Sequence, residues 1–343
     1  MTEDWENGGF GIYIHWPFCT AKCPYCDFNS HVRSNINQKQ WLKAYLNEIK
    51  RVSEKTSNRI LNSVFFGGGT PSLIEPSIIG DVLNEIQKHW KTKNNFEVTL
   101  EANPGSVDAK NFKAYKEAGV NRTSMGIQSL NTKDLKALGR THTVEEALAA
   151  FEIARQNFKA VSFDLIYARQ NQNISQWEKE LSLALSLEAS HMSLYQLTIE
   201  QGTAFGDRYN RGLLKGLPND DTSADMYDLT LSLCEDRGLV SYEVSNYAHQ
   251  GYESIHNLIY WRYGDYIGIG PGAHGRLTID GKKYATETVL SPEAWLKKVE
   301  CDGSGESNSV VLTDQQQAAE FVMMGLRLKE GINYQRFKNL SGS

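Results

Sequence analysis

The chain is poor in cysteine and has no long apolar run, and both absences exclude classes of protein to which it could belong. Five cysteines in 343 residues are too few for the disulfide framework of a secreted protein. No apolar run approaches the roughly twenty residues that span a bilayer, and the acidic N-terminal run MTEDWENGG lacks the core of a signal peptide. A formal net charge of -5 argues against a surface built around nucleic-acid phosphates. We therefore expect a cytoplasmic protein of enzyme size, without a nucleic-acid partner.

Three of the five cysteines lie close together, in the run HWPFCTAKCPYCDFNS. Cys19, Cys23 and Cys26 follow the pattern C-x3-C-x2-C, and Phe28 occupies the place where a fourth thiol could follow. Closely spaced thiolates on one loop are typical ligands of an iron–sulfur cluster. Three thiolates on a four-iron cluster leave one iron open to a ligand that is not protein. The spacing therefore predicts a 4Fe–4S cluster with one open iron.

Other interpretations of the cysteines stay open at this point. A zinc site could combine the three thiols with one histidine, because His15 and His31 flank the loop. Inert buried thiols are a weaker alternative, since such residues have no reason to cluster beside a proline and aromatic residues. Cys234 and Cys301 stand alone, and we interpret both as ordinary packed residues.

Strand-like and helix-like stretches alternate through the first half of the chain. The strand candidates cover residues 11–16, 63–68, 97–102, 122–129, 160–167 and 191–198. The amphipathic helix candidates cover residues 38–56, 78–90, 109–118, 144–156 and 176–187. This alternation predicts βαβ units around a parallel sheet, with about six repeats instead of the eight of a closed barrel. An open partial barrel and a doubly wound sheet both fit the pattern, and the length predicts a further, appended domain.

Polar and glycine-rich residues recur where the predicted strands end. The cysteine loop follows the first strand, and the run GGGTPS follows the second. Glu101, Gln128 and Asp164 lie at or near the ends of the next three strands. Each has a structural alternative, because the glycines could form a tight turn and Glu101 could pair with Arg122 or Arg140. Since the carboxyl ends of parallel strands share one rim, their joint position predicts a single ligand site.

These motifs, taken in order, resemble the radical S-adenosylmethionine (SAM) superfamily. Closer similarity to the oxygen-independent coproporphyrinogen III oxidase group extends from about Gly11 to Met324, and lies in the runs YIHWPFC, GGGTPS, EANP, SMGIQS and FDLIY. True oxidases of this group carry another cysteine at the place of Phe28. A second branch, the HemW-type heme chaperones, typically has an aromatic residue there and carries an H-N-x-x-Y-W motif. The chain matches that motif at residues 256–261, and its run YIGIGPGAHG also resembles the second branch.

The resemblance implies both a fold and a set of cofactor contacts. The implied fold is α/β, with a partial (β/α)6 radical SAM barrel over residues 1–205 and a smaller C-terminal α+β domain over residues 206–343. The three clustered cysteines would hold the 4Fe–4S cluster, whose open iron takes the amine and carboxylate of SAM. The positions that match SAM contacts in the family are Tyr13, Gly68, Gly69, Thr70, Glu101, Gln128, Arg140 and Asp164.

The H-N-x-x-Y-W motif carries the implied heme function. Its members are His256, Asn257, Tyr260 and Trp261. Imidazole is a common axial ligand of heme iron, and on a helix His256 and Tyr260 share one face. A structural histidine among core aromatic residues is the alternative. The resemblance implies a chaperone that binds heme and delivers it to apoproteins such as respiratory enzymes, some of them at a membrane, without coproporphyrinogen oxidase activity.

Two other functions stay open. A radical SAM oxidase acting on coproporphyrinogen would need the same cluster and SAM, with an electron donor. A zinc-stabilised binding module would have no redox chemistry.

The family commonly shows Gly-Leu-Pro after Tyr167, whereas this chain has Ala168-Arg169-Gln170. Family members also usually extend further at the C-terminus, so we expect the appended domain to be shortened.

Overall fold

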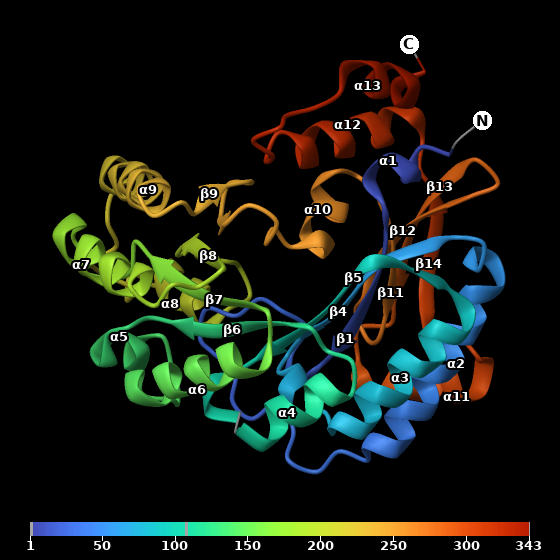
Figure 1. The fold of residues 1–343 in the computed structure, drawn as a ribbon, viewed down its shortest axis with the longest axis horizontal. Coiled ribbons are helices and arrows are strands. Elements are labelled where there is room, and N and C mark those ends of the chain that lie inside the picture. Colours follow the sequence, from blue (N-terminus) through green and yellow to red (C-terminus); the bar gives the residue numbers. More distant parts are fainter. Residues whose placement is uncertain (1–2, 107–108, 343) are drawn as a thin grey trace.

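A long mixed sheet forms the centre of the molecule in the computed structural model, which describes residues 3–106 and 109–342. Within these residues, twelve strands join one sheet in the order β14-β13-β12-β11-β1-β4-β5-β6-β7-β8-β10-β9 (Figure 1). The six strands expected from the sequence lie side by side in chain order and are all parallel. They are β1 (Phe10–Trp16), β4 (Ile60–Gly68), β5 (Lys91–Ala102), β6 (Arg122–Gln128), β7 (Ala160–Tyr167) and β8 (His191–Gln196). The predicted α/β fold class is confirmed.

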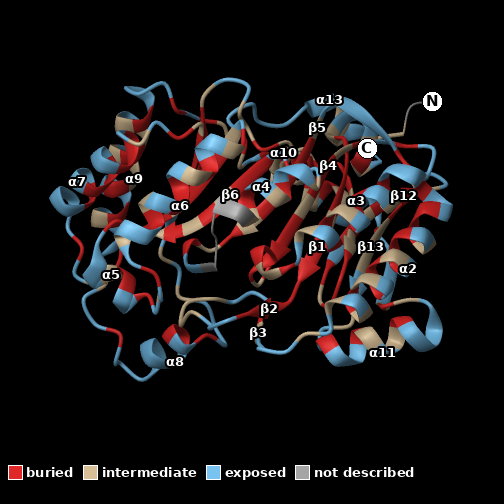
Figure 2. Ribbon diagram, turned by 60° about the horizontal axis from the view of Figure 1, so that its bottom comes forward, coloured by how far each residue is buried: buried red, intermediate tan, exposed pale blue. Residues whose placement is uncertain are grey.

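The connecting helices form because each has one apolar face that packs on the sheet. In α2 the buried residues Trp41, Tyr45, Ile49 and Val52 recur at helical spacing, and the Asn37 side chain caps the first turn by accepting from the Gln40 N–H. The helices between the parallel strands are α2 (Gln38–Thr56), α3 (Pro76–His89), α4 (Ala109–Glu117), α5 (Thr132–Ala137), α6 (Val144–Asn157) and α7 (Ile174–Leu185). Buried residues gather on the strands and exposed residues on the outer helix faces (Figure 2).

The second half of the chain extends the same sheet at both edges. At one edge β10 (Asn246–Ala248) pairs with β8, and β9 (Val240–Ser241) follows. At the other edge β11 (Asp265–Ile269) pairs with β1 in parallel, more than 250 residues along the chain. The antiparallel strands β12 (His274–Ile279), β13 (Lys282–Thr288) and β14 (Glu306–Val311) complete that edge. The division into domains 1–205 and 206–343 stays a prediction.

Helices of the second half lie around this extended sheet. They are α8 (Ala204–Asn210), α9 (Asp220–Glu235), α10 (Ile255–Trp261), α11 (Pro292–Asp302), α12 (Asp314–Gly325) and α13 (Tyr334–Ser341), while the short α1 (Trp5–Gly8) precedes β1. In Figure 1, α10 lies on the side of the sheet away from α2, α3 and α4, and α12 and α13 lie above it. Among the described residues, no helix has the length and apolar character that crossing a membrane requires.

Candidate functional site

The cysteine loop lies against the carboxyl ends of the parallel strands. The short strands β2 (Phe18–Cys19) and β3 (His31–Val32) pair with each other and hold the two ends of the loop together. All three thiols are free, and all three line one cavity of about 130 Å³. We call it the cysteine cavity. The predicted SAM contacts that line the same cavity are Gly68, Gly69, Thr70, Glu101, Gln128, Arg140 and Asp164. The structure therefore brings together every predicted cluster and SAM residue except Tyr13.

The glycine run approaches the loop so closely that side chains would not fit. Gly68 has φ 114°, and a Cβ there would lie 2.6 Å from the His15 ring. A Cβ on Gly69 would lie 2.6 Å from the Phe18 carbonyl oxygen. The Gly69 and Thr70 N–H groups donate to the backbone of the first strand and the loop, at 2.7 and 2.8 Å. These glycines therefore hold the loop against the end of β4.

Two buried carboxyl groups face the cysteine cavity. Burial raises the pKa of Glu101 to about 8, and the nearby Asp164 adds to the rise, although the Gly68 N–H donates to Glu101 Oε2 at 3.1 Å. Burial also raises the pKa of Asp164 to about 6, against hydrogen bonds from two serines. Within the described residues Glu101 forms no ion pair, because Arg122 pairs with Glu97 instead. Both carboxyl groups are thus available to a polar ligand.

Arg140 and Gln128 complete the wall opposite the glycines. Arg140 Nη1 lies 3.2 Å from Cys23 Sγ, and Nη2 donates to the Gly126 carbonyl at 2.8 Å. Arg140 therefore contacts both the cysteine loop and the end of β6. Gln128, at the end of β6, has φ 73°, a backbone conformation that non-glycine residues rarely adopt.

The residues at the cysteine cavity fit an iron–sulfur cluster better than a zinc ion. Among the described residues, no three His, Cys, Asp or Glu side chains are arranged to bind one metal ion. Neither His15 nor His31 lines the cavity, so a fourth zinc ligand from these histidines is missing. Three unpaired thiols around one cavity suit a cluster, because each thiolate then binds a different iron.

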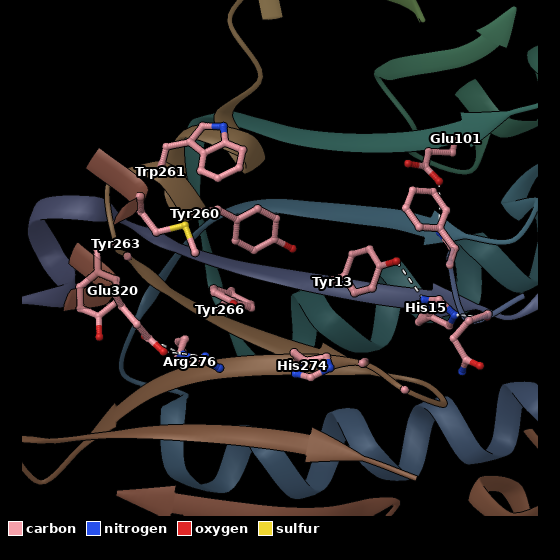
Figure 3. Close-up of a pocket in the computed structure, with 17 residues that line it drawn as sticks. Tyr13, His15, Glu101, Tyr260, Trp261, Tyr263, Tyr266, His274, Arg276 and Glu320 are labelled. Atoms are coloured by element: carbon pink, nitrogen blue, oxygen red, sulfur yellow. Dashed lines mark hydrogen bonds and ion pairs between the residues drawn. The ribbon is translucent and has the colours of Figure 1, made fainter. Parts of the chain in front are cut away.

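A second and larger cavity adjoins the first and contains most of the aromatic residues near the site. Its volume is about 430 Å³, and Phe28, Gly68 and Glu101 line both cavities. We call it the aromatic cavity (Figure 3). Its side chains include Tyr13, His15, Phe28, Tyr260, Trp261, Tyr263, Tyr266, His274, Arg276, Glu320 and Met324. Tyr13 thus lies in this cavity, where its hydroxyl is 2.9 Å from His15 Nδ1.

The H-N-x-x-Y-W motif does not lie as a whole in the aromatic cavity. Tyr260 and Trp261 line the cavity from α10, whereas His256 and Asn257 do not. The His256 side chain is buried against β4, with Nδ1 2.8 Å from Ser63 Oγ and Nε2 2.7 Å from the Tyr260 hydroxyl. Burial lowers the pKa of His256 to about 3, so the imidazole is neutral near pH 7. In this arrangement both ring nitrogens are already hydrogen-bonded.

Several residues of the aromatic cavity were not expected from the sequence as site residues. Tyr263, Glu320 and Met324 come from the region after the motif, and no recognisable pattern marks them. Tyr266 and His274 lie in the run YIGIGPGAHG, so the resemblance of that run to the HemW branch was a usable signal.

The comparisons with known proteins agree with this geometry. The profile of the radical SAM superfamily matches residues 13–184, and that of the HemN C-terminal domain matches residues 312–343. A protein of Haemophilus influenzae named heme chaperone HemW is 39% identical over 338 residues, which cover 96% of this chain and 86% of that protein. The chain belongs to the HemW family of radical SAM proteins.

Two further relatives and one solved structure are similar to the chain. Escherichia coli HemW is 38% identical over 289 residues, covering 83% of this chain and 75% of that protein. A zebrafish (Danio rerio) protein named radical S-adenosyl methionine domain-containing protein 1, mitochondrial, is 39% identical over 335 residues, covering 96% and 75%. The Escherichia coli coproporphyrinogen III oxidase HemN superposes with a TM-score of 0.82 at 19% identity, covering 99% and 80%. This last likeness establishes a shared fold.

Proposed function

We propose that the protein is a heme chaperone, which binds heme in the aromatic cavity and holds a 4Fe–4S cluster and SAM in the adjoining cysteine cavity. The observation that carries the proposal is the open cavity lined by aromatic side chains beside three free thiols. This arrangement of cavity and thiols lies in a chain that is 38–39% identical to two relatives named heme chaperone HemW.

The residues of the cysteine cavity have separate tasks under this proposal. Cys19, Cys23 and Cys26 would bind the cluster, and Arg140 would hold the Cys23 sulfur in place by a hydrogen bond. Glu101 and Asp164 would accept hydrogen bonds from SAM in a site that excludes water. A reduced cluster with SAM supplies one-electron chemistry when it is bound. The protein therefore has to position these groups and shield them, and an electron donor is needed only if that chemistry is used.

The aromatic cavity would serve as a temporary site for heme. Its walls are apolar rings on which a porphyrin could pack, and its side at β12 carries an exposed histidine, His274. Phe28, with 56% of its surface exposed, stands where the oxidases carry a further cysteine. We propose that heme passes from this site to an apoprotein such as a respiratory enzyme, in the cytoplasm or at a membrane surface.

One anaerobic experiment tests the proposal against both alternatives. The full chain is reconstituted with iron and sulfide, analysed for both elements, titrated with heme, and incubated with SAM, reductant and coproporphyrinogen. A chaperone contains a four-iron cluster, binds heme, and forms no vinyl-porphyrin product. Formation of that product would favour the oxidase instead. A preparation that retains zinc and no sulfide would contradict the cluster.

A further inference from the structure

The aromatic cavity presents few atoms that could bind heme iron. Its metal-binding side chains are two imidazoles, the thioether of Met324 and a set of tyrosine hydroxyls. His15 is already occupied, because Nδ1 lies 2.9 Å from the Tyr13 hydroxyl and Nε2 lies 2.9 Å from the Asn29 carbonyl oxygen. Binding iron through His15 would break one of these buried hydrogen bonds.

The tyrosines of the cavity are poor iron ligands in this environment. Burial raises the pKa of Tyr13, Tyr260, Tyr263 and Tyr266. Since heme iron binds the phenolate of a tyrosine, a raised pKa disfavours this ligand at neutral pH. These rings remain suited to packing, and Tyr260 and Tyr266 meet edge to face with centroids 4.4 Å apart.

His274 differs from the other imidazole of the cavity in being accessible. It opens β12 on the cavity wall (Figure 3), and 59% of its side chain is exposed. Its Nδ1 lies 3.9 Å from Glu287 Oε1, and in the part of the chain that the structure describes no hydrogen bond involves its Nε2. At 3.9 Å the carboxylate does not hold the ring by a hydrogen bond. Among the described residues the exposed imidazole therefore has no hydrogen bond to break before it binds iron.

We infer that His274, and not His256, is the axial ligand of heme in this cavity. The inference rests on the proposed heme function and names the residue that would hold the iron. Heme would lie on the rings of Tyr266, Tyr260 and Trp261, with its iron at His274 Nε2. Arg276 follows His274 by two residues on β12, and its guanidinium could bind a propionate of the heme. In the ligand-free protein this guanidinium pairs with Glu320 at 2.9 Å. Because His274 is exposed, heme bound there could leave without unfolding the core.

Titration with two porphyrins separates iron ligation from simple packing. The reconstituted full chain and its variants are titrated with ferric heme and, separately, with metal-free protoporphyrin, which packs but has no iron. We expect His274→Ala to weaken heme binding by at least roughly 10-fold, because losing only the hydrogen-bond partner of a metal ligand already costs roughly 10- to 100-fold in affinity. It should shift the visible spectrum of bound heme and leave protoporphyrin binding unchanged. Added imidazole should restore the wild-type spectrum.

Two further variants and the wild type define the outcomes. His249→Ala serves as the control, because His249 lies outside both cavities and binds the Gly238 carbonyl. It should bind both porphyrins as the wild type does. Met324→Leu changes a residue of the cavity wall, so it should alter the affinity for both porphyrins alike and keep the wild-type spectrum of bound heme. An unchanged heme spectrum in His274→Ala, equal loss of both porphyrins, or loss of the spectrum in Met324→Leu would overturn the ligand assignment. A wild type that binds neither porphyrin would overturn the heme function itself.

Discussion

Glu101 is a buried acid whose charge depends on what occupies the cysteine cavity. Its pKa of about 8 means that the carboxyl group is largely protonated at neutral pH in the ligand-free protein. A ligand that brings an amine or hydroxyl donor would favour the carboxylate and lower this pKa. Binding of such a ligand must then release a proton below pH 8.

The first prediction concerns the pH dependence of SAM binding to the reconstituted protein. Because SAM must displace the proton from Glu101, its dissociation constant should fall as the pH rises from about 6.5 to about 8, by at most about tenfold per pH unit. Well above pH 8 the carboxyl group is ionised before SAM binds, and the effect should level off. Glu101→Gln should bind SAM more weakly and without this slope. Equilibrium binding at several pH values measures both proteins, and the same slope in the variant would exclude Glu101 as its source.

At the level of single residues, the sequence was sufficient to predict the position of those site residues that lie at the ends of predicted strands. Glu101 and Asp164 could be placed on one rim because parallel strands end together, and the structure puts both in the cysteine cavity. Tyr13 lines the aromatic cavity instead of the cysteine cavity. The direction of its side chain from β1 could not be predicted without knowing which strands pair with β1. The pKa values could not be predicted either, because they arise from burial between distant strands.

The helix α10 connects the core to the aromatic cavity. His256 anchors it on β4 through Ser63 and stacks on Phe65, with ring centroids 5.0 Å apart. Its other nitrogen fixes the hydroxyl of Tyr260, which lines the cavity. We therefore assign His256 the task of positioning Tyr260 and the rest of α10.

The second prediction is that His256→Ala loosens this helix. It removes two buried hydrogen bonds and a stacked ring, which should lower the free energy of unfolding by roughly 2–4 kcal/mol. Ser63→Ala removes one of the two bonds and should cost about 1–2 kcal/mol. Urea unfolding measures both values. If His256→Ala lost heme without losing stability, His256 would be the heme ligand after all.

The stability difference between wild type and His256→Ala should also depend on pH. His256 has a pKa of about 3 in the folded protein and 6.5 as its ordinary value. Between these values the unfolded chain binds more protons than the folded one, so the stability that His256 contributes is present above pH 6.5 and declines as the pH falls. The difference should shrink by at most about 1.4 kcal/mol per pH unit. A constant difference from pH 7 to pH 5 would contradict the buried, neutral imidazole.

Elements differ in how far local sequence determines them. The six parallel strands and the helices α2, α3, α4, α6 and α7 could be predicted because each is long and periodic, and α2 begins and ends at the expected residues. The short α5, β2 and β3 were not expected, and the edge strands could not be predicted either. β9 and β10 span two and three residues, and β11 is defined by its pairing with β1, more than 250 residues away. Such pairing depends on the tertiary structure, which no local pattern contains.

At the scale of the whole molecule, a buried group of charges joins the two halves of the chain. Asp265 at the start of β11 accepts from Arg59, which precedes β4, at 2.6 Å, and Lys283 of β13 lies 3.2 Å from its other oxygen. Lys283 also donates to the Tyr263 carbonyl at 3.0 Å and lies 3.8 Å from the Tyr263 ring centroid. The strand β12, which carries His274 and Arg276, pairs with β13 and is therefore tied to the strands that carry the cysteine loop.

The last prediction tests whether this connection makes the molecule unfold as one unit. Lys283→Met leaves Asp265 paired with Arg59 but removes the buried donor to the Tyr263 and Gly264 carbonyls, which should cost roughly 1–3 kcal/mol of unfolding free energy. Its neighbour Lys282 is exposed on the same strand, so Lys282→Met should change stability by no more than about 0.5 kcal/mol. Hydrogen exchange in Lys283→Met should accelerate in β4 as well as in β12 and β13, because strands in one cooperative unit open together. Faster exchange confined to residues 265–311 would show instead that this edge of the sheet unfolds independently of the part that holds the cysteine cavity.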